Sequence, residues 1–209
     1  MTRLLVNKYI LLAAVTVGVL VTDQWTKYVV LDELTTAFDG KVGVGAKLGG
    51  MYGSAPPAVV TDGLHYRQRR IITVSDNFLM IRYAENPGAA WGLFRNLPEG
   101  VRGPLFHVVS IGAVFLILHY YRKLTGDPAE KWARWGLPLV LGGAVGNYMD
   151  RLARGFVVDF IEAHWFEKAT WPSFNVADSA ICVGVGMLVL DSLLRREGTK
   201  PSPQGVGER

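Results

Sequence analysis

An all-α membrane protein with four transmembrane helices is the fold class that this sequence predicts. Half of the 209 residues are apolar, only 19% are charged, and several long stretches carry no charge. Because a bilayer requires about 20 mostly apolar residues in each spanning helix, this pattern favours a small polytopic membrane protein over a soluble globule. We expect a single integral membrane domain over residues 1–209, with helices at about 9–31, 104–121, 133–149 and 177–194.

The first segment is uncharged over residues 9–22 and continues through Asp23 and Lys27 to residue 31. The alternative is a secretory signal peptide, because Arg3 and Lys8 precede an apolar run of suitable length. No small-x-small cleavage site follows in VLVTDQWTK, so we expect a retained helix.

The three later segments differ in character. Residues 104–121 carry no charge apart from that of two histidines, and residues 133–149 contain four glycines that allow neighbouring helices to approach closely. The segment at 177–194 is apolar through ICVGVGMLVL.

Basic residues cluster before the first helix, between the second and third, and after the fourth. The positive-inside rule therefore places both termini in the cytoplasm.

The long outer connection divides into parts of different composition. Residues 39–70 are rich in glycine, with a basic HYRQRR run, and read as a flexible or irregular insertion. The next stretch, IITVSDNFLMIRY, predicts two short strands of a small β-rich element. In AENPGAAWGLF, Trp91 and Phe94 favour a short helix in the membrane interface. The tail at 197–209 lacks the apolar residues needed to fold and is expected to be disordered.

Composition argues against several other classes of function. The single cysteine, Cys182, cannot form an intramolecular disulfide, and we expect it to be a small residue packed between helices. The four histidines are scattered without the spacing of metal ligands, so no metal site is expected. The net charge of +4 is explained by orientation in an anionic membrane and does not call for nucleic acid.

Two acids, Asp159 and Asp178, stand where apolar sequence meets irregular sequence. A carboxylate at a membrane boundary is costly and marks a functional site. If folding brings the two together, repulsion between like charges keeps one proton on the pair, which is the chemistry of an aspartic protease. The alternatives are a solvated loop acid for Asp159 and a helix N-cap for Asp178.

Four stretches together resemble one family, the lipoprotein signal peptidases, also called signal peptidase II. They are TDQWTK, ENPGAAWGLF, GGAVGNYMDRLARGFVVDFI and FNVADSAI, in this order, with 19 residues separating Asp159 from Asp178. The resemblance covers about two-thirds of the chain and departs from the family pattern in the long insertion and in the tail.

The resemblance implies an aspartic endopeptidase of the bacterial inner membrane, with its site at the outer, periplasmic face. Asp159 and Asp178 match the catalytic aspartates. The implied substrate is a diacylglyceryl-modified prolipoprotein, cut on the amino side of the lipidated cysteine, and no cofactor is implied. We expect a monomer surrounded by membrane lipid. Other matching positions, which support the site or hold substrate, are Asp23, Lys27, Asn86, Gly143, Asn147, Asp150, Arg151 and Asn175.

Physical reasons for some of these residue types stand apart from the resemblance. Asp23 and Lys27 lie four apart on one helix face and can pair, which is a structural alternative to a substrate role. Asn147 and Asn175 can hold a carboxylate, or equally satisfy backbone groups at a helix end. Arg151 suits a bidentate carboxylate contact, and Asp150 can fix the loop that leaves the third helix.

Three rival functions remain open from the sequence. A proton-coupled transporter also uses intramembrane acids, but its acids lie near the middle of the membrane, and no inverted repeat is visible here. A Ser-Lys signal peptidase would use Lys27 with Ser179 or Ser110 and should survive Asp159→Asn. A purely structural membrane protein would tolerate Asp178→Asn as well.

Overall fold

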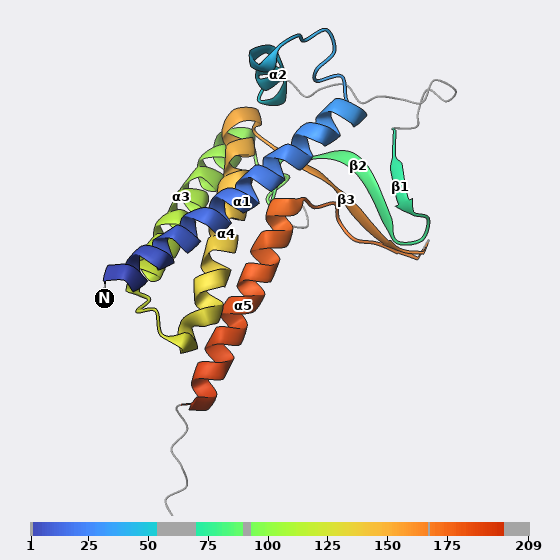
Figure 1. The fold of residues 1–209 in the computed structure, drawn as a ribbon. Coiled ribbons are helices and arrows are strands. Elements are labelled where there is room, and N and C mark those ends of the chain that lie inside the picture. The colour runs from blue at the N-terminus through green and yellow to red at the C-terminus, as the bar shows by residue number, and fades with distance from the viewer. Residues whose placement is uncertain (1, 54–69, 90–92, 167, 199–209) are drawn as a thin grey trace, which may run out of the picture.

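In the computed structural model, which describes residues 2–53, 70–89, 93–166 and 168–198, long helices form a bundle with an antiparallel sheet at one end (Figure 1). The long helices are α1 (Thr2–Leu34), α3 (Glu99–Lys123), α4 (Lys131–Arg154) and α5 (Val176–Gly198). The shorter elements are α2 (Val44–Met51), the 3₁₀ turn η2 (Pro128–Glu130), β1 (Ile72–Ser75), β2 (Leu79–Asn86), β3 (Val157–Trp165) and β4 (Ala169–Thr170).

Each long helix extends beyond the range expected from its apolar residues. The reason is that charged residues such as Arg and Lys are good helix formers, so an apolar segment marks only the middle of its helix.

The prediction of disorder from residue 197 is wrong for its first two residues, because α5 continues to Gly198. Residues 199–209 lie outside the described part of the chain.

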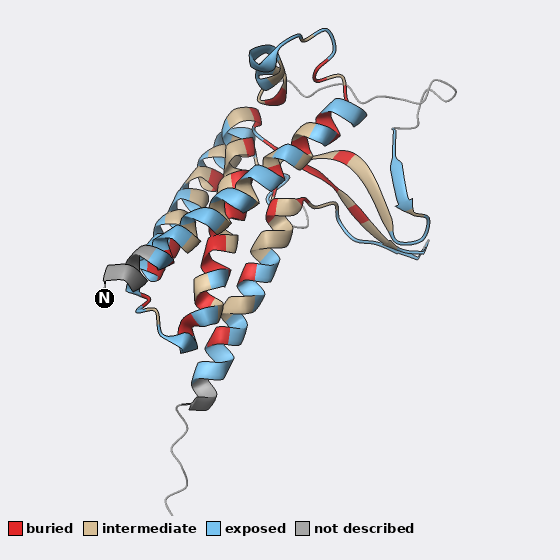
Figure 2. Ribbon diagram, in the orientation of Figure 1, coloured by how far each residue is buried: buried red, intermediate tan, exposed pale blue. Residues whose placement is uncertain are grey.

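Three helices of the described chain are long and apolar enough to cross a membrane: Asn7–Leu34 of α1, Glu99–Lys123, which is α3, and Val176–Arg195 of α5. Their outward faces expose large apolar side chains, for example Val21 at 60%, Phe115 at 70% and Val183 at 55% (Figure 2). The fourth expected span, α4, is not among these three helices. It packs against α1, α3 and α5, so fewer of its residues need to suit lipid.

Close helix contact in the bundle depends on glycine, as the composition of the third segment predicts. A Cβ atom on Gly136 of α4 would lie 2.7 Å from the carbonyl oxygen of Gly184 in α5. The reverse substitution at Gly184 would place its Cβ 2.6 Å from the carbonyl oxygen of Gly136. The α4 and α5 backbones therefore meet at a distance that no side chain permits.

Helix α1 runs parallel to α4. Thr16 Oγ1 donates to the Pro138 carbonyl oxygen at 3.3 Å, and further along the pair Lys27 Nζ lies 2.8 Å from Asp150 Oδ2. Near the start of α1, Lys8 Nζ donates to the Leu124 carbonyl oxygen at 2.7 Å, next to the end of α3. The start of α1 and the end of α5 accordingly lie at the end of the bundle opposite the sheet (Figure 1).

The sheet has the order β1-β2-β3-β4 and is antiparallel throughout. The expected pair of short strands is confirmed as β1 and β2. Strand β3 was not expected, because VVDFIEAHW follows the third helix directly and was treated as irregular. A register shift between Ile81 and Ala84 lets β2 continue along β3 as far as the pairing of Asn86 with Val157.

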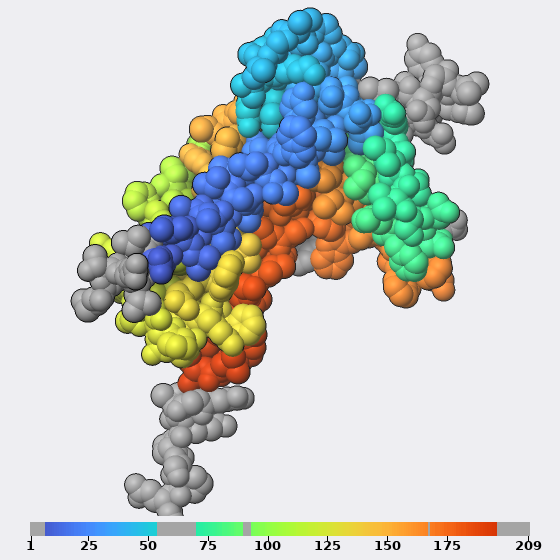
Figure 3. All heavy atoms as spheres, in the orientation of Figure 1, coloured from blue at the N-terminus to red at the C-terminus, as the bar shows by residue number. Residues whose placement is uncertain are grey.

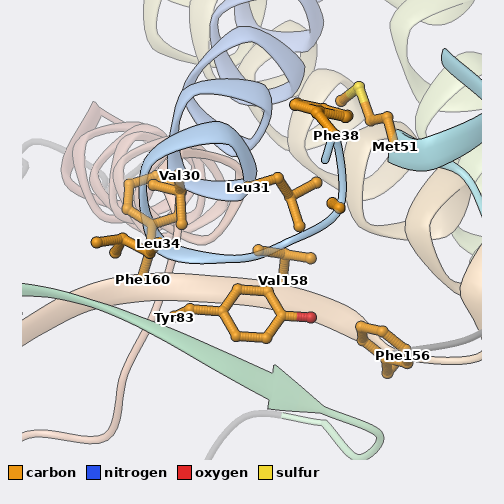
Figure 4. Packing of buried hydrophobic residues seen from close by; sticks show 10 residues of the cluster. Val30, Leu31, Leu34, Phe38, Met51, Tyr83, Phe156, Val158 and Phe160 are labelled. Carbon is orange, nitrogen blue, oxygen red and sulfur yellow. The ribbon is translucent and has the colours of Figure 1, made fainter. Parts of the chain in front are cut away.

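The main apolar cluster joins the end of α1 to the sheet and to the insertion (Figure 4). Leu31 and Leu34 of α1 pack with Val158 of β3, Tyr83 of β2 and Met51 of α2. The prediction that 39–70 is irregular is therefore wrong for its first part, which forms α2 and buries Met51 to 4% exposure. Residues 54–69, which include most of the basic HYRQRR run, lie outside the described residues.

The expected interfacial helix falls partly outside the described residues, which omit Trp91. Phe94 lies in a turn, where the centre of its ring is 6.4 Å from the centre of the Phe106 ring in α3. Cys182 is on an exposed face of α5, so the expectation that it packs between helices is wrong.

Candidate active site

Asp159 is the third residue of β3 and is only 2% exposed, which excludes a solvated loop acid. Asn86 at the end of β2 donates from Nδ2 to Asp159 Oδ2 at 3.0 Å, because the pairing of the two strands brings these residues together. Asn175 donates from Nδ2 to Asp159 Oδ1 at 2.8 Å. Both oxygens of this buried carboxyl group therefore have an amide partner.

Asp178 lies in the first turn of α5 and is partly buried. It forms a reciprocal cap with Asn175: the Asp178 amide donates to Asn175 Oδ1 at 2.9 Å, and the Asn175 amide donates to Asp178 Oδ2 at 3.2 Å. Asn147 of α4 donates from Nδ2 to Asp178 Oδ1 at 2.7 Å. The residue that caps the helix is thus Asn175, and Asp178 sits three residues inside it.

Asn175 is the residue that holds the two acids together. It is fully buried, and its backbone amide contacts Asp178 while its side-chain amide contacts Asp159. The same Nδ2 also donates to Asn147 Oδ1 at 3.1 Å and to the Val158 carbonyl oxygen at 3.3 Å. The two readings left open for Asn175, a carboxylate contact and a helix cap, are both correct.

The surroundings of Asp159 favour its protonated form. Burial, and after it the charge of Asp178, raise the pKa of Asp159 to about 7, although hydrogen bonds from Asn86 and Asn175 act in the opposite direction. At neutral pH this carboxyl group is therefore protonated in a substantial fraction of molecules. Asp178 is less buried, and both of its oxygens accept hydrogen bonds, one from Asn147 and one from the Asn175 amide.

A buried group of charges lies directly behind the acids. Lys27 Nζ is 2.8 Å from Asp23 Oδ2 and 2.8 Å from Asp150 Oδ2, and all three side chains have no exposed surface. The pairing of Asp23 with Lys27, expected from their spacing, is confirmed. Lys27 also donates to Asn147 Oδ1 at 3.3 Å. None of these partners of Lys27 is a serine, as a Ser-Lys peptidase would require.

This charged group fixes the backbone that carries each acid. Asp23 Oδ1 accepts from the Ala177 amide at 3.0 Å, next to Asp178. Asp150 Oδ2 accepts from the Val158 amide at 3.2 Å, next to Asp159. The expectation that Asp150 fixes the segment after the third helix is confirmed by this contact.

Arg151 and Gly143 support the site in different ways. Arg151 Nη2 donates to the Gly88 carbonyl oxygen at 2.9 Å and its guanidinium lies 4.5 Å from the centre of the Phe106 ring. These contacts are structural and do not include a bidentate pair with a carboxylate: Arg151 secures the loop after Asn86. A Cβ on Gly143 would collide with the Ala177 carbonyl oxygen, so glycine permits α5 to begin against α4.

Two residues near the site, Gln24 and Arg154, were missed from the sequence. Gln24 donates from Nε2 to Asp23 Oδ2 at 3.0 Å and accepts from the Tyr52 hydroxyl at 2.7 Å. Arg154 Nη1 lies 3.7 Å from Asp150 Oδ1, and its guanidinium is 5.4 Å from the centre of the Tyr52 ring. The four-residue spacing of Asp150 and Arg154 was a usable signal. The contacts of Tyr52 with both residues span distant segments, so no local pattern indicated them.

The fold and the site are those of a membrane aspartic protease: a bundle with apolar helices carries two aspartates, one on strand β3 and one on helix α5, in one hydrogen-bonded group. Residues 15–194 match the family model for signal peptidase II. The chain belongs to the signal peptidase II family.

Relatives and solved structures agree with this assignment. The chain is 42% identical over 207 residues to the lipoprotein signal peptidase of Anaeromyxobacter sp. strain Fw109-5, covering 97% of this chain and 94% of the relative. It is 43% identical over 134 residues to that of Syntrophotalea carbinolica, covering 63% and 80%. Two solved bacterial membrane enzymes share the fold, with TM-scores of 0.63 and 0.57 at 23% and 24% identity. They cover 91% and 88% of this chain, and 92% of each structure is covered.

Proposed function

We propose that this protein removes the signal peptide from diacylglyceryl-modified prolipoproteins, cutting the peptide bond on the amino side of the lipidated cysteine. The observation that carries the proposal is the hydrogen bonding of both Asp159 and Asp178 to Asn175. Membership of the signal peptidase II family supplies the substrate class. Membership of a peptidase family gives the transporter hypothesis no support.

The two acids take different roles because their surroundings differ. Asp159, more deeply buried and with a pKa of about 7, is the acid that hydrogen-bonds to the scissile carbonyl oxygen and donates its proton. Asp178 is the base that removes a proton from the attacking water. This division follows the rule that paired acids in unlike environments separate into acid and base.

The reaction needs no covalent intermediate. Water oxygen bonds to the carbonyl carbon while Asp178 accepts a water proton and Asp159 protonates the carbonyl oxygen. The tetrahedral intermediate then collapses: the carbon–nitrogen bond breaks, the proton held by Asp178 passes to the departing amine of the lipidated cysteine, and Asp159 recovers its own from the hydroxyl that becomes the new carbonyl. Both acids return to their starting protonation states.

The remaining family positions fall into two groups in this proposal. Asn86, Asn147 and Asn175 orient the acids through the hydrogen bonds described above. A second group holds the supporting backbone and the loop beside the site, and comprises Asp23, Lys27, Gly143, Asp150 and Arg151.

We further propose that α4 is a fourth span, since it lies among α1, α3 and α5 and is about as long as they are. The basic residues at the ends of α3 and α5 then lie in the cytoplasm with both termini. The acids lie at the outer face of the inner membrane, where exported precursors emerge. The protein acts within membrane lipid, and a monomer would suffice, since one chain supplies both acids together with Asn86, Asn147 and Asn175.

The test is cleavage of a diacylglyceryl-modified precursor by the purified protein in lipid. Asp159→Asn and Asp178→Asn should each remain folded and lose at least about a hundredfold in rate, because each removes an essential acid or base. Asp39→Asn, at an exposed position, is the matched control and should retain full activity. Normal activity in either site variant would overturn the mechanism, and equal cleavage of an unlipidated precursor would overturn the substrate class.

A further inference from the structure

Four exposed aromatic side chains gather on the turns at the far end of the sheet. Phe78 lies in the turn between β1 and β2, Trp165 and Phe166 lie where β3 turns towards β4, and Trp171 follows β4. They are exposed by 44%, 63%, 45% and 57%, respectively. We call this group the aromatic tip.

Ring contacts and a backbone hydrogen bond join three members of the aromatic tip, Phe78, Trp165 and Phe166. The centre of the Phe78 ring lies 5.6 Å from the centre of the Trp165 ring and 5.3 Å from the centre of the Phe166 ring. The Phe166 amide donates to the Asn77 carbonyl oxygen at 2.9 Å, which joins the two turns. Phe166 also has a φ of 51°, a conformation that costs about 1 kcal/mol or more outside glycine. The turns therefore present the rings in a fixed arrangement.

The aromatic tip lies near the level at which a candidate membrane-spanning helix, α5, begins. In Figure 1 the sheet bends away from the bundle, and its turns lie well below α2 and about level with the beginning of α5. The third candidate span begins at this point, with Val176. Figure 3 shows open space between the end of the sheet and the bundle. The tip thus reaches the level at which the candidate span of α5 begins.

Aromatic composition indicates what covers the tip. Tryptophan and other amphipathic aromatic rings are enriched where membrane headgroups meet the acyl chains. Lys168 lies exposed in the same turn region and is suited to lipid phosphate. A second copy is a poorer fit, because four half-exposed rings of roughly 200 Å² each offer about 400 Å², against about 800 Å² per partner in a stable interface.

We propose that the aromatic tip inserts into the headgroup region of the outer leaflet and that its partner is membrane phospholipid. The contact fixes the far end of the sheet, whose near end carries Asp159, relative to the membrane surface. The proposal goes beyond the proteolytic function: it uses the proposed position of α5 but not the roles of the two acids.

The test places a fluorescent label beside the tip in the full-length protein in nanodiscs. Cys182→Ala removes the native thiol, and Lys168→Cys provides a single labelling site at the tip. Val42→Cys is the matched control, since Val42 is 91% exposed and precedes α2 at the other side of the sheet. Nitroxide on the lipid headgroup should quench the label at 168 by more than half, and aqueous iodide should quench it at least threefold less than at 42.

A second pair of variants tests whether the rings cause the insertion. Trp165→Ser combined with Phe166→Ser should raise iodide quenching at 168 to the level at 42. Ile71→Ser combined with Ile72→Ser, which changes exposed apolar residues at the end of β1 away from the tip, should leave quenching at 168 unchanged.

Three outcomes would overturn the proposal. The first is iodide quenching at 168 equal to that at 42, without quenching by lipid nitroxide. The second is protection from both quenchers that disappears when the protein is diluted into excess lipid, which would identify a second copy as the partner. The third is unchanged lipid quenching after loss of the two rings in a folded variant.

Discussion

Neutralising Lys27 tests how far the buried charges behind the site stabilise the fold. Lys27→Met keeps an unbranched side chain of similar length but removes the cation that lies 2.8 Å from each of two carboxylates, Asp23 and Asp150. All three side chains are fully buried, so water cannot replace the lost partner. The carboxylates retain hydrogen bonds from the Ala177 and Val158 amides, and Asp150 retains Arg154 at 3.7 Å.

The expected cost follows from these contacts. Removing one partner of a buried ion pair typically costs about 3–5 kcal/mol, because the remaining charge stays desolvated. Two carboxylates lose their cation here, but their remaining donors offset part of the penalty, so we expect a loss of about 3–5 kcal/mol in the free energy of unfolding. That is a factor of at least about a hundred in the folding equilibrium.

The assay is reversible denaturant unfolding of the purified protein in mixed micelles. Lys123→Met, at an exposed position at the end of α3, is the control and should change stability by no more than about 0.5 kcal/mol. The double variant Lys27→Met with Asp150→Asn should recover part of the loss, because one uncompensated charge is removed as well. A loss below about 1 kcal/mol for Lys27→Met would refute the reasoning, since it would mean that the carboxylates are not desolvated charges.

Three other predictions concern the acid pair, the insertion and the helix contact. The pKa of Asp159 rises from 3.8 to about 7 on folding. Between these values the folded chain keeps a proton that the unfolded chain releases, so this group lowers the free energy of unfolding by about 1.4 kcal/mol per pH unit as pH rises. Asp159→Asn should abolish that slope in unfolding measured from pH 4 to 7, and an unchanged slope would contradict the assigned pKa. Tyr52→Phe should cost about 1 kcal/mol in the same measurement at neutral pH, because Gln24 Oε1 loses its donor; no loss would show that the insertion does not secure α1. Gly143→Val should lower the Tm strongly or prevent folding, whereas Gly112→Val, which meets nothing within 4 Å, should have a small effect on thermal unfolding. Equal Tm values for the two valine variants would contradict the close approach of α4 and α5.

Local sequence rules predicted the parts of this fold that depend on neighbours along the chain. Apolar runs located the long helices, and β-branched residues located β1 and β2. The four-residue spacing of Asp23 and Lys27 predicted their ion pair, because this spacing brings side chains to one helix face. The family motifs then placed Asp159 and Asp178 among the residues of one site.

Contacts between distant segments were not available from the sequence. Asn86 reaches Asp159 only because β2 pairs with β3, and nothing in either segment alone fixes that register. Lys27 reaches Asp150 across helices, so its second carboxylate was not expected. Helix α2 was missed because its glycines lower helix propensity, while its stability depends on packing such as that of Met51 against the end of α1.

The cap at the beginning of α5 has a consequence for the life of the newly made chain. Asn175 contacts one acid through its backbone and the other through its side chain, and the acids also need Asn86 and Asn147 from two further elements. Under the proposed mechanism, the site is therefore complete only when α5 has packed against α4 and the sheet. A nascent polypeptide still entering the bilayer then carries both aspartates without the assembled site, so completion of folding would itself be the activation step.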